Sequence, residues 1–102
     1  MVILNQLSPG GYNMIEKELI IKNKSGLDSK PAALFIQKAS NFQATIWIEN
    51  NERKANAKSL LGLLSLGLGS GTKVLLSADG DDEAKAIDEL MRYLSQEIEE
   101  SV

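Results

Sequence analysis

A serine followed by a short leucine-rich stretch is the feature of this sequence best suited to a chemical switch. Ser59 precedes an apolar segment that ends in glycines, residues 60–71. Serine is favoured just before a helix because its side-chain oxygen accepts a hydrogen bond from an otherwise unpaired amide, and glycine ends helices because it enters the left-handed region at little steric cost. A phosphoryl group on this serine would add about −1.5 to −2 charges at the start of the helix. We therefore expect Ser59 to be either a plain helix cap or a regulatory phosphorylation site.

The leucines of this predicted helix divide into two apolar faces. At about 100° per residue, Leu63 and Leu66 fall on one side and Leu60, Leu61 and Leu64 on another. The first pair can pack against a sheet. The other three are either covered by a second layer or exposed as a docking patch. A chain of 102 residues has little room for burial on both sides, so we expect an exposed docking patch beside the serine.

Composition excludes most other site chemistries. The sequence has no histidine and no cysteine, so a Ser-His-Asp or Cys-His catalytic set and a disulfide framework are impossible. The acidic residues between positions 79 and 83 lack the spacing of a calcium-binding loop. The glycines of residues 67–71 precede Thr72 and Lys73, whereas a phosphate-binding loop needs the lysine before the threonine, so we interpret them as a helix stop. We expect no enzyme activity, no metal and no cofactor.

Length and charge predict one soluble domain. The chain has 102 residues, 43% of them hydrophobic and 25% charged, with a net charge of −3. No basic block points to nucleic-acid binding. No apolar run approaches the ~18 residues of a membrane span. The apolar residues at positions 2–4 lack the basic flank of a signal peptide, so the expected location is the cytoplasm.

The hydrophobic periodicity predicts strands and helices in the order βαββαβα. The expected elements are a strand at 14–22, a helix from 31 to about 41, strands at 44–49 and 53–56, a helix from 59, a strand at 72–78 and a helix from about 80 to 98. Half-buried strands and one-sided helices predict an α+β open-faced sandwich, in which an antiparallel sheet carries all helices on one face. Residues 1–13, with a turn signal at Ser8-Pro9-Gly10-Gly11, are a leader, and residues 14–102 form the domain.

Two segments and the order of elements resemble HPr, the phosphocarrier protein of the bacterial sugar phosphotransferase system. The segments are the loop at residues 25–33, Ser-Gly-Leu-Asp-Ser-Lys-Pro-Ala-Ala, and residues 56–66, Asn-Ala-Lys-Ser-Leu-Leu-Gly-Leu-Leu-Ser-Leu. The resemblance covers about residues 15–98 and needs no gap. It implies a four-stranded antiparallel sheet in the order 1-4-2-3 under three helices.

The sequence departs from HPr at the residue that carries the phosphoryl group. The HPr loop reads Gly-Ile/Leu-His-Ala-Arg-Pro-Ala, and here Asp28 stands at the histidine position and Lys30 at that of the arginine. Without histidine the chain cannot relay phosphohistidine. Asp28 could form an acyl phosphate, but lysine holds a phosphate less well than arginine, and Asp28 also suits the cap of a helix with Pro31 in its first turn. We expect the cap.

Ser59 matches the regulatory serine of the HPr family. In low-GC Gram-positive bacteria, HPr kinase/phosphorylase modifies that serine with ATP, and the catabolite-repression (Crh) type keeps the serine but lacks the active histidine, as here. The modified proteins act as corepressors of a LacI-type catabolite-control transcription factor. The resemblance therefore implies a regulatory protein whose partner contacts are Leu60, Leu61, Leu64 and Lys30. A phosphoryl carrier that uses the aspartate and an unmodified interaction module remain as alternatives.

One apolar feature is not explained by the resemblance. Ile20, Trp47 and Leu75 should point away from the helices on adjacent strands, on a face that should meet water. The leader or a second subunit could cover them. Scattered surface hydrophobes without a role are the simpler alternative.

Overall fold

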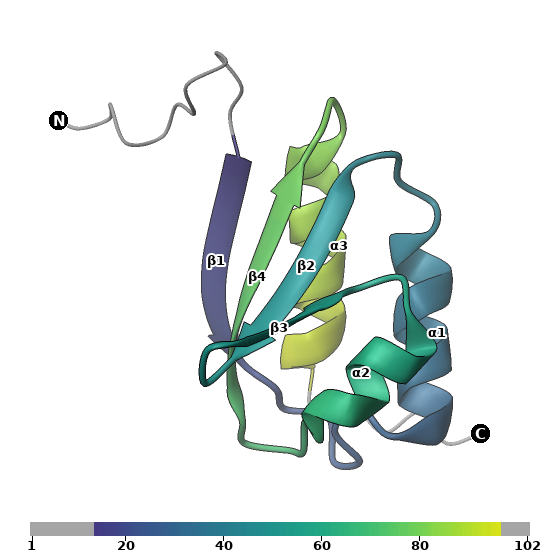
Figure 1. The fold of residues 1–102 in the computed structure, drawn as a ribbon, viewed down its shortest axis with the longest axis vertical. Helices are drawn as coiled ribbons and strands as arrows, with labels where there is room; N and C mark the ends of the chain where they lie inside the picture. The colour runs from purple at the N-terminus through teal and green to yellow at the C-terminus, as the bar shows by residue number, and fades with distance from the viewer. Residues whose placement is uncertain (1–13, 97–102) are drawn as a thin grey trace, which may run out of the picture.

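The computed structural model describes residues 14–96. Within that range, four strands form one sheet, and three helices cover one of its faces (Figure 1). The elements are β1 (Met14–Ile20), α1 (Ser29–Ala39), β2 (Thr45–Asn50), β3 (Arg53–Asn56), α2 (Leu60–Leu66), β4 (Lys73–Asp79) and α3 (Glu83–Ser95). The predicted order of elements is confirmed. The predicted leader, its turn signal and the last residues of the final predicted helix lie outside the described residues.

The sheet has the order β1-β4-β2-β3, and every pair is antiparallel. The register places Ile48 of β2 opposite Leu76 of β4 on one side and Ala55 of β3 on the other, and Ile15 of β1 opposite Ala78. Because side chains alternate along a strand, these residues share the face that the helices cover. The predicted fold class and strand order are therefore confirmed.

The core lies between this inner face and the three helices. Its fully buried side chains include Ile46, Ile48, Val74 and Leu76 from the sheet, Phe35 from α1, Leu63 from α2, and Leu90 and Leu94 from α3. Each helix thus buries one apolar stripe against the sheet. Burial of such side chains stabilises the folded state by about 25 cal/mol per Å² of apolar surface removed from water. The same packing fixes the position of each helix end.

The first strand ends earlier than predicted, because hydrogen bonds to distant residues replace the regular pairing of β1 with β4. We predicted that the first strand continues to residue 22, but β1 ends at Ile20. The Ile21 amide donates to the Thr72 carbonyl and the Lys22 amide to the Leu94 carbonyl of α3, so the chain leaves the β1–β4 ladder while Ile21 stays buried. Asn51 and Glu52 form the two-residue turn that joins β2 to β3.

The outer face of the sheet carries the predicted apolar residues. Ile20 of β1 lies opposite Lys73 of β4. Leu75 lies on β4, diagonal to Ile20, and Trp47 lies on the next strand, β2, diagonal to Leu75. Ile20 is exposed, and Leu75 and Trp47 are half-buried. The Lys54 Nζ lies 5.0 Å from the centre of the Trp47 ring, a cation–π contact that covers part of the indole. We call Ile20, Leu75 and Trp47 the outer stripe.

Candidate functional site

Ser59 is the residue immediately before α2, and its hydroxyl caps that helix. Its backbone is extended (φ −110°, ψ 116°), and Oγ accepts a hydrogen bond from the Gly62 amide at 3.1 Å. Its backbone amide donates to the Asn56 carbonyl at 3.0 Å, and its carbonyl accepts from the Leu63 amide at 3.0 Å. These contacts fix the serine while its side chain stays partly exposed, so a kinase could reach the hydroxyl.

The leucines of α2 are divided as the helical spacing predicted. Leu63 and Leu66 are buried, with 0% and 8% exposed. Leu60, Leu61 and Leu64 are 45%, 80% and 41% exposed, which excludes burial on both sides within the described fold. We call these three exposed leucines the α2 patch. Large apolar side chains gathered on one exposed surface are typical of a docking site.

The helix that carries the patch is fixed along its length. A Cβ at Gly62 would lie 3.3 Å from the Cβ of Ala55, so α2 is pressed closely against β3 at this point. Nη2 of Arg53 donates to the Ser65 carbonyl at 2.8 Å near the end of the helix. Gly67 then ends α2 in the left-handed conformation (φ 63°), donating its amide to the Leu64 carbonyl. The glycine stop predicted from the sequence is confirmed, and the patch is presented by a rigid element.

Asp28 directly precedes α1 but does not cap it with its side chain. Its backbone is extended (φ −114°, ψ 149°), and within the described fold its side chain makes no capping hydrogen bond. Asp28 thus stands at the expected N-cap position, but the side-chain hydrogen bond expected of a cap is not formed. The reason lies in the next residue: Ser29 has a positive φ of 33°, so the chain enters the helix along an unusual path. The carboxylate is exposed to solvent, and Lys30 is exposed in the first turn of α1.

The loop before Asp28 is anchored to the segment that follows α2. The Leu27 amide donates to the Leu68 carbonyl at 2.8 Å. Gly26 has φ 65°, and a Cβ there would come within 2.6 Å of the Gly69 Cα, so only glycine fits this contact. Asp28 therefore lies near the C-terminal end of α2, whereas Ser59 lies at its other end. The seven residues of the helix, about 10 Å long, separate the two candidate phosphorylation sites.

Lys58 and Asp82 each bind the backbone of residues 42–44, through contacts that the sequence did not reveal. The Lys58 Nζ donates to the Phe42 carbonyl at 2.7 Å. Asp82 directly precedes α3, and its carboxylate accepts hydrogen bonds from the Gln43 and Ala44 amides at 2.8 and 2.9 Å. The hydrogen bond from Gln43 chiefly lowers the pKa of Asp82, with smaller contributions from Ala44 and the Lys58 charge. No local sequence signal indicates these contacts, because the bonded residues lie 16 to 39 positions apart.

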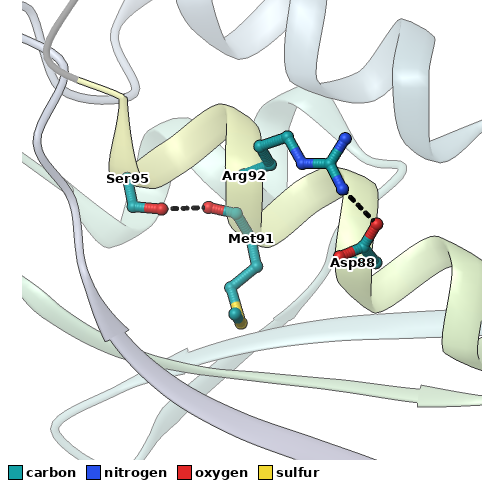
Figure 2. A network of polar contacts seen from close by, with 4 residues as sticks. All are labelled: Asp88, Met91, Arg92 and Ser95. Atoms are coloured by element: carbon teal, nitrogen blue, oxygen red, sulfur yellow. Dashed lines mark hydrogen bonds and ion pairs between the residues drawn. The ribbon is translucent and has the colours of Figure 1, made fainter.

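The far side of the helical layer carries a polar groove between α1 and α3. It encloses about 510 Å³ and is lined in part by Leu34, Phe42 and Tyr93. Figure 2 shows two α3 residues from its neighbourhood, Asp88 and Arg92, whose side chains form an ion pair with an N–O distance of 2.6 Å. Both side chains are exposed, so the pair contributes at most about 1 kcal/mol. The four-residue spacing of opposite charges is the sequence signal for this pair.

The side chains and helices of residues 14–96 form neither a metal-binding cluster nor a membrane span. Within that range no group of three or more histidine, cysteine, aspartate and glutamate residues is placed to hold a metal ion. In the same range no helix has the length and apolar character to cross a bilayer.

Comparison with known proteins identifies the family. Residues 15–96 match the family model described as the PTS HPr component phosphorylation site. The HPr-like protein Crh of Halalkalibacterium halodurans is 44% identical over 84 residues, which are 82% of this chain and the whole of that protein. The HPr-like protein Crh of Bacillus subtilis is 40% identical over 85 residues, 83% of this chain and again the whole relative.

Solved structures agree with this assignment. HPr-C-His of Thermoanaerobacter tengcongensis superposes with a TM-score of 0.79 at 48% identity, over 81% of this chain and 93% of that one. Crh of Bacillus subtilis, described as a dimer with a swapping domain, superposes with a TM-score of 0.67 at 39% identity, over 82% and 97% of the two chains. With the family model covering most of the chain and the same fold found in these relatives, the protein belongs to the HPr family.

Proposed function

We propose that this protein is a non-catalytic regulatory member of the HPr family, switched by phosphorylation of Ser59. In this proposal HPr kinase/phosphorylase transfers the γ-phosphoryl group of ATP to the Ser59 hydroxyl, and the α2 patch then docks on a LacI-type catabolite-control transcription factor in the cytoplasm. The observation that carries the proposal is the exposure of the α2 patch beside Ser59 in a chain that has no histidine. The relatives named Crh, at 40% and 44% identity, support a role in catabolite repression.

The local contacts support a switch that changes binding without remodelling the fold. The Ser59 Oγ already accepts a hydrogen bond from the helix, and a phosphate ester keeps an oxygen at that position. The α2 helix is held independently by Gly62 against Ala55 and by the Arg53 side chain at its far end. The added charge therefore lies next to exposed leucines on a fixed helix, where it can pair with basic groups of a partner.

The test is mass spectrometry after incubation with HPr kinase/phosphorylase and ATP. The wild-type protein should gain one phosphate, and Ser59→Ala should gain none. Ser65→Ala is the matched control, because Ser65 is an exposed serine on the same helix and its loss should leave the modification intact. An unmodified wild-type protein, or a phosphate that persists in Ser59→Ala, would overturn the proposal.

A second candidate function is phosphoryl transfer through Asp28. The favouring observation is that the Asp28 carboxylate is exposed and makes no capping hydrogen bond with α1 in the described fold. A carboxylate oxygen would attack the phosphorus of a phosphohistidine donor, the N–P bond would break, and an acyl phosphate would form. Phosphate that hydroxylamine removes and that Asp28→Asn abolishes would support this route. Acid-stable phosphate on Ser59 alone would exclude it.

A further inference from the structure

The outer face of the sheet carries an apolar diagonal that the three helices leave uncovered. The helices lie on the opposite face, so Ile20, Leu75 and Trp47 point away from the core (Figure 1). Ile20 is 44% exposed, and Leu75 and Trp47 are half-buried. Because neighbouring strands lie about 4.8 Å apart and alternate residues of one strand about 6.8 Å apart, the outer stripe is about 17 Å long.

Unpaired carboxylates surround the outer stripe. By the strand register, the acidic residues of the outer face are Glu16, Glu18, Glu49 and Asp79. Among the residues that the structure describes, none of these four side chains forms an ion pair or a hydrogen bond with another residue. Two lysines share the face, Lys73 and Lys54, and the latter lies over the Trp47 ring. The apolar stripe therefore lies in a negatively charged surface.

A hollow of about 530 Å³ lies at the middle of the outer stripe. Its lining includes Leu75, and the register places Glu18 and Glu49 on the two strands beside this leucine, one on each side. Lys73 and Asn50 also line it, and the Asn50 side chain donates to the Lys73 carbonyl at 2.9 Å. An apolar side chain between two carboxylates suits a long cationic side chain. The methylene stem of that side chain packs on the leucine while its charged end meets the carboxylates.

The ends of this chain do not supply such a side chain. Residues 1–13 contain no charged side chain, and the charged side chains of residues 97–102 are all glutamates. A second copy of the outer face would bring four more carboxylates and only two lysines close to the apolar centre, which is unfavourable. The negative face equally disfavours nucleic acid and anionic lipid. The chemistry of the surface therefore favours a cationic segment of another protein.

We propose that the outer face docks an amphipathic helix of a partner protein. Its apolar side chains lie on the outer stripe, and its lysine or arginine side chains lie beside Glu16, Glu18 and Glu49. A helix rises about 1.5 Å per residue, so about twelve residues span the stripe, with apolar side chains at positions i, i+4, i+7 and i+11. The docked helix covers the outer face of the sheet as α1, α2 and α3 cover the inner one. The proposal does not depend on phosphorylation of Ser59.

Titration of the full chain with two synthetic peptides tests this docking. The cationic peptide is Leu-Arg-Lys-Leu-Leu-Arg-Lys written twice, and the acidic peptide has glutamate in place of every arginine and lysine. The cationic peptide should shift the NMR amide signals of Ile20, Leu75 and Trp47 and leave that of Leu61 unchanged. The acidic peptide should not bind this face. Absence of binding, equal binding of the two peptides, or shifts confined to the α2 patch would overturn the proposal.

Charge reversal beside the hollow separates a specific site from general attraction to an acidic protein. Glu18→Lys should weaken binding of the cationic peptide about fivefold or more, because it replaces an attraction with a repulsion next to Leu75. Asp81→Lys makes the same change of net charge at an exposed residue of the loop before α3 and is the matched control. Fluorescence of Trp47, the single tryptophan of the sequence, measures both affinities. Equal affinities of the two variants would contradict docking on the outer face.

The same NMR signals detect two other occupants of the outer face when no peptide is present. Signals of Leu75 and Trp47 that shift with protein concentration would assign the face to a second copy of the chain. Signals that shift in Ile3→Asp would assign it to residues 1–13. Either result would overturn the proposal, which expects both signals to stay unchanged until the cationic peptide is added.

Discussion

Leu61 and Leu63 are two residues of α2 with different expected roles, Leu61 in partner binding and Leu63 in the stability of the fold. Leu63 is fully buried, and its replacement by alanine should destabilise the fold by about 2–5 kcal/mol because it leaves a cavity. Leu61 is 80% exposed, so Leu61→Ala should change the free energy of unfolding by no more than about 0.5 kcal/mol. Chemical denaturation measures both values. A large loss of stability in Leu61→Ala would show that this side chain is a core residue and would remove it from the docking patch.

Asp82 should make the stability of the fold depend on pH. Its pKa is lowered in the folded state, chiefly by the hydrogen bond from the Gln43 amide. A carboxyl whose pKa is lower in the folded state stabilises the protein at pH values above its unfolded pKa, and that stabilisation is lost as the pH falls through the folded pKa. Asp82→Asn should therefore lower Tm at neutral pH, and the difference from wild type should shrink as the pH falls through the lowered pKa of Asp82. Thermal unfolding followed across pH 2–7 checks this expectation. A gap in Tm that stays constant across that range would contradict it.

Asp28 and Asp82, which both directly precede a helix, show what a local rule leaves out. The expectation that Asp28 caps α1 rests on such a rule, which places aspartate at helix starts. The side chain of Asp82 instead binds the amides of Gln43 and Ala44, which lie 39 and 38 positions away in the sequence. The side chain of Asp28 is exposed because the positive φ of Ser29 changes the path into α1. Competing tertiary partners and an unusual backbone angle are not visible in a single sequence.

Among elements, the turn between β2 and β3 offers a stabilising substitution. Asn51 and Glu52 both have positive φ, 53° and 68°, which is the geometry of a two-residue type I′ turn. Asparagine tolerates that region, but glutamate does so at a cost of about 1–2 kcal/mol. Glu52→Gly should therefore stabilise the protein by roughly 0.5–1 kcal/mol, since part of the gain is offset by the greater freedom of glycine in the unfolded chain. Asn51→Gly is the matched control and should gain less. Denaturant unfolding of both variants gives the comparison, and a destabilised Glu52→Gly protein would contradict the strain in this turn.

The elements themselves were predictable from hydrophobic periodicity, but some of their ends were not. Alternation at Ile46 and Ile48 identified β2, and the spacing of Leu63 and Leu66 identified the buried side of α2. The end of β1 was missed because the amides of Ile21 and Lys22 bond to the Thr72 and Leu94 carbonyls, distant partners that no local pattern encodes. The α1–α3 groove was missed for the same reason, since it exists only once the two helices are packed.

For the whole molecule, the fold presents distinct surfaces on its two sides. The helical side carries Ser59, the α2 patch and, at the far end of α2, the loop with Asp28. The sheet side carries the outer stripe. The resemblance to HPr predicted this architecture correctly, whereas the use of each surface depends on partners that neither sequence nor fold contains. The regulatory hypothesis therefore has to be tested by binding.

The most direct measurement is the affinity of the protein for a purified LacI-type catabolite-control transcription factor, with and without phosphate on Ser59. Coupling free energies between sites are typically 1–3 kcal/mol, so the phosphorylated protein should bind about 5- to 150-fold more tightly. Leu61→Lys, which should leave the fold intact because Leu61 is exposed, should abolish most of that gain. Equal affinities of the phosphorylated and unphosphorylated proteins, or an undiminished gain in Leu61→Lys, would contradict a switch at Ser59 that acts through the α2 patch.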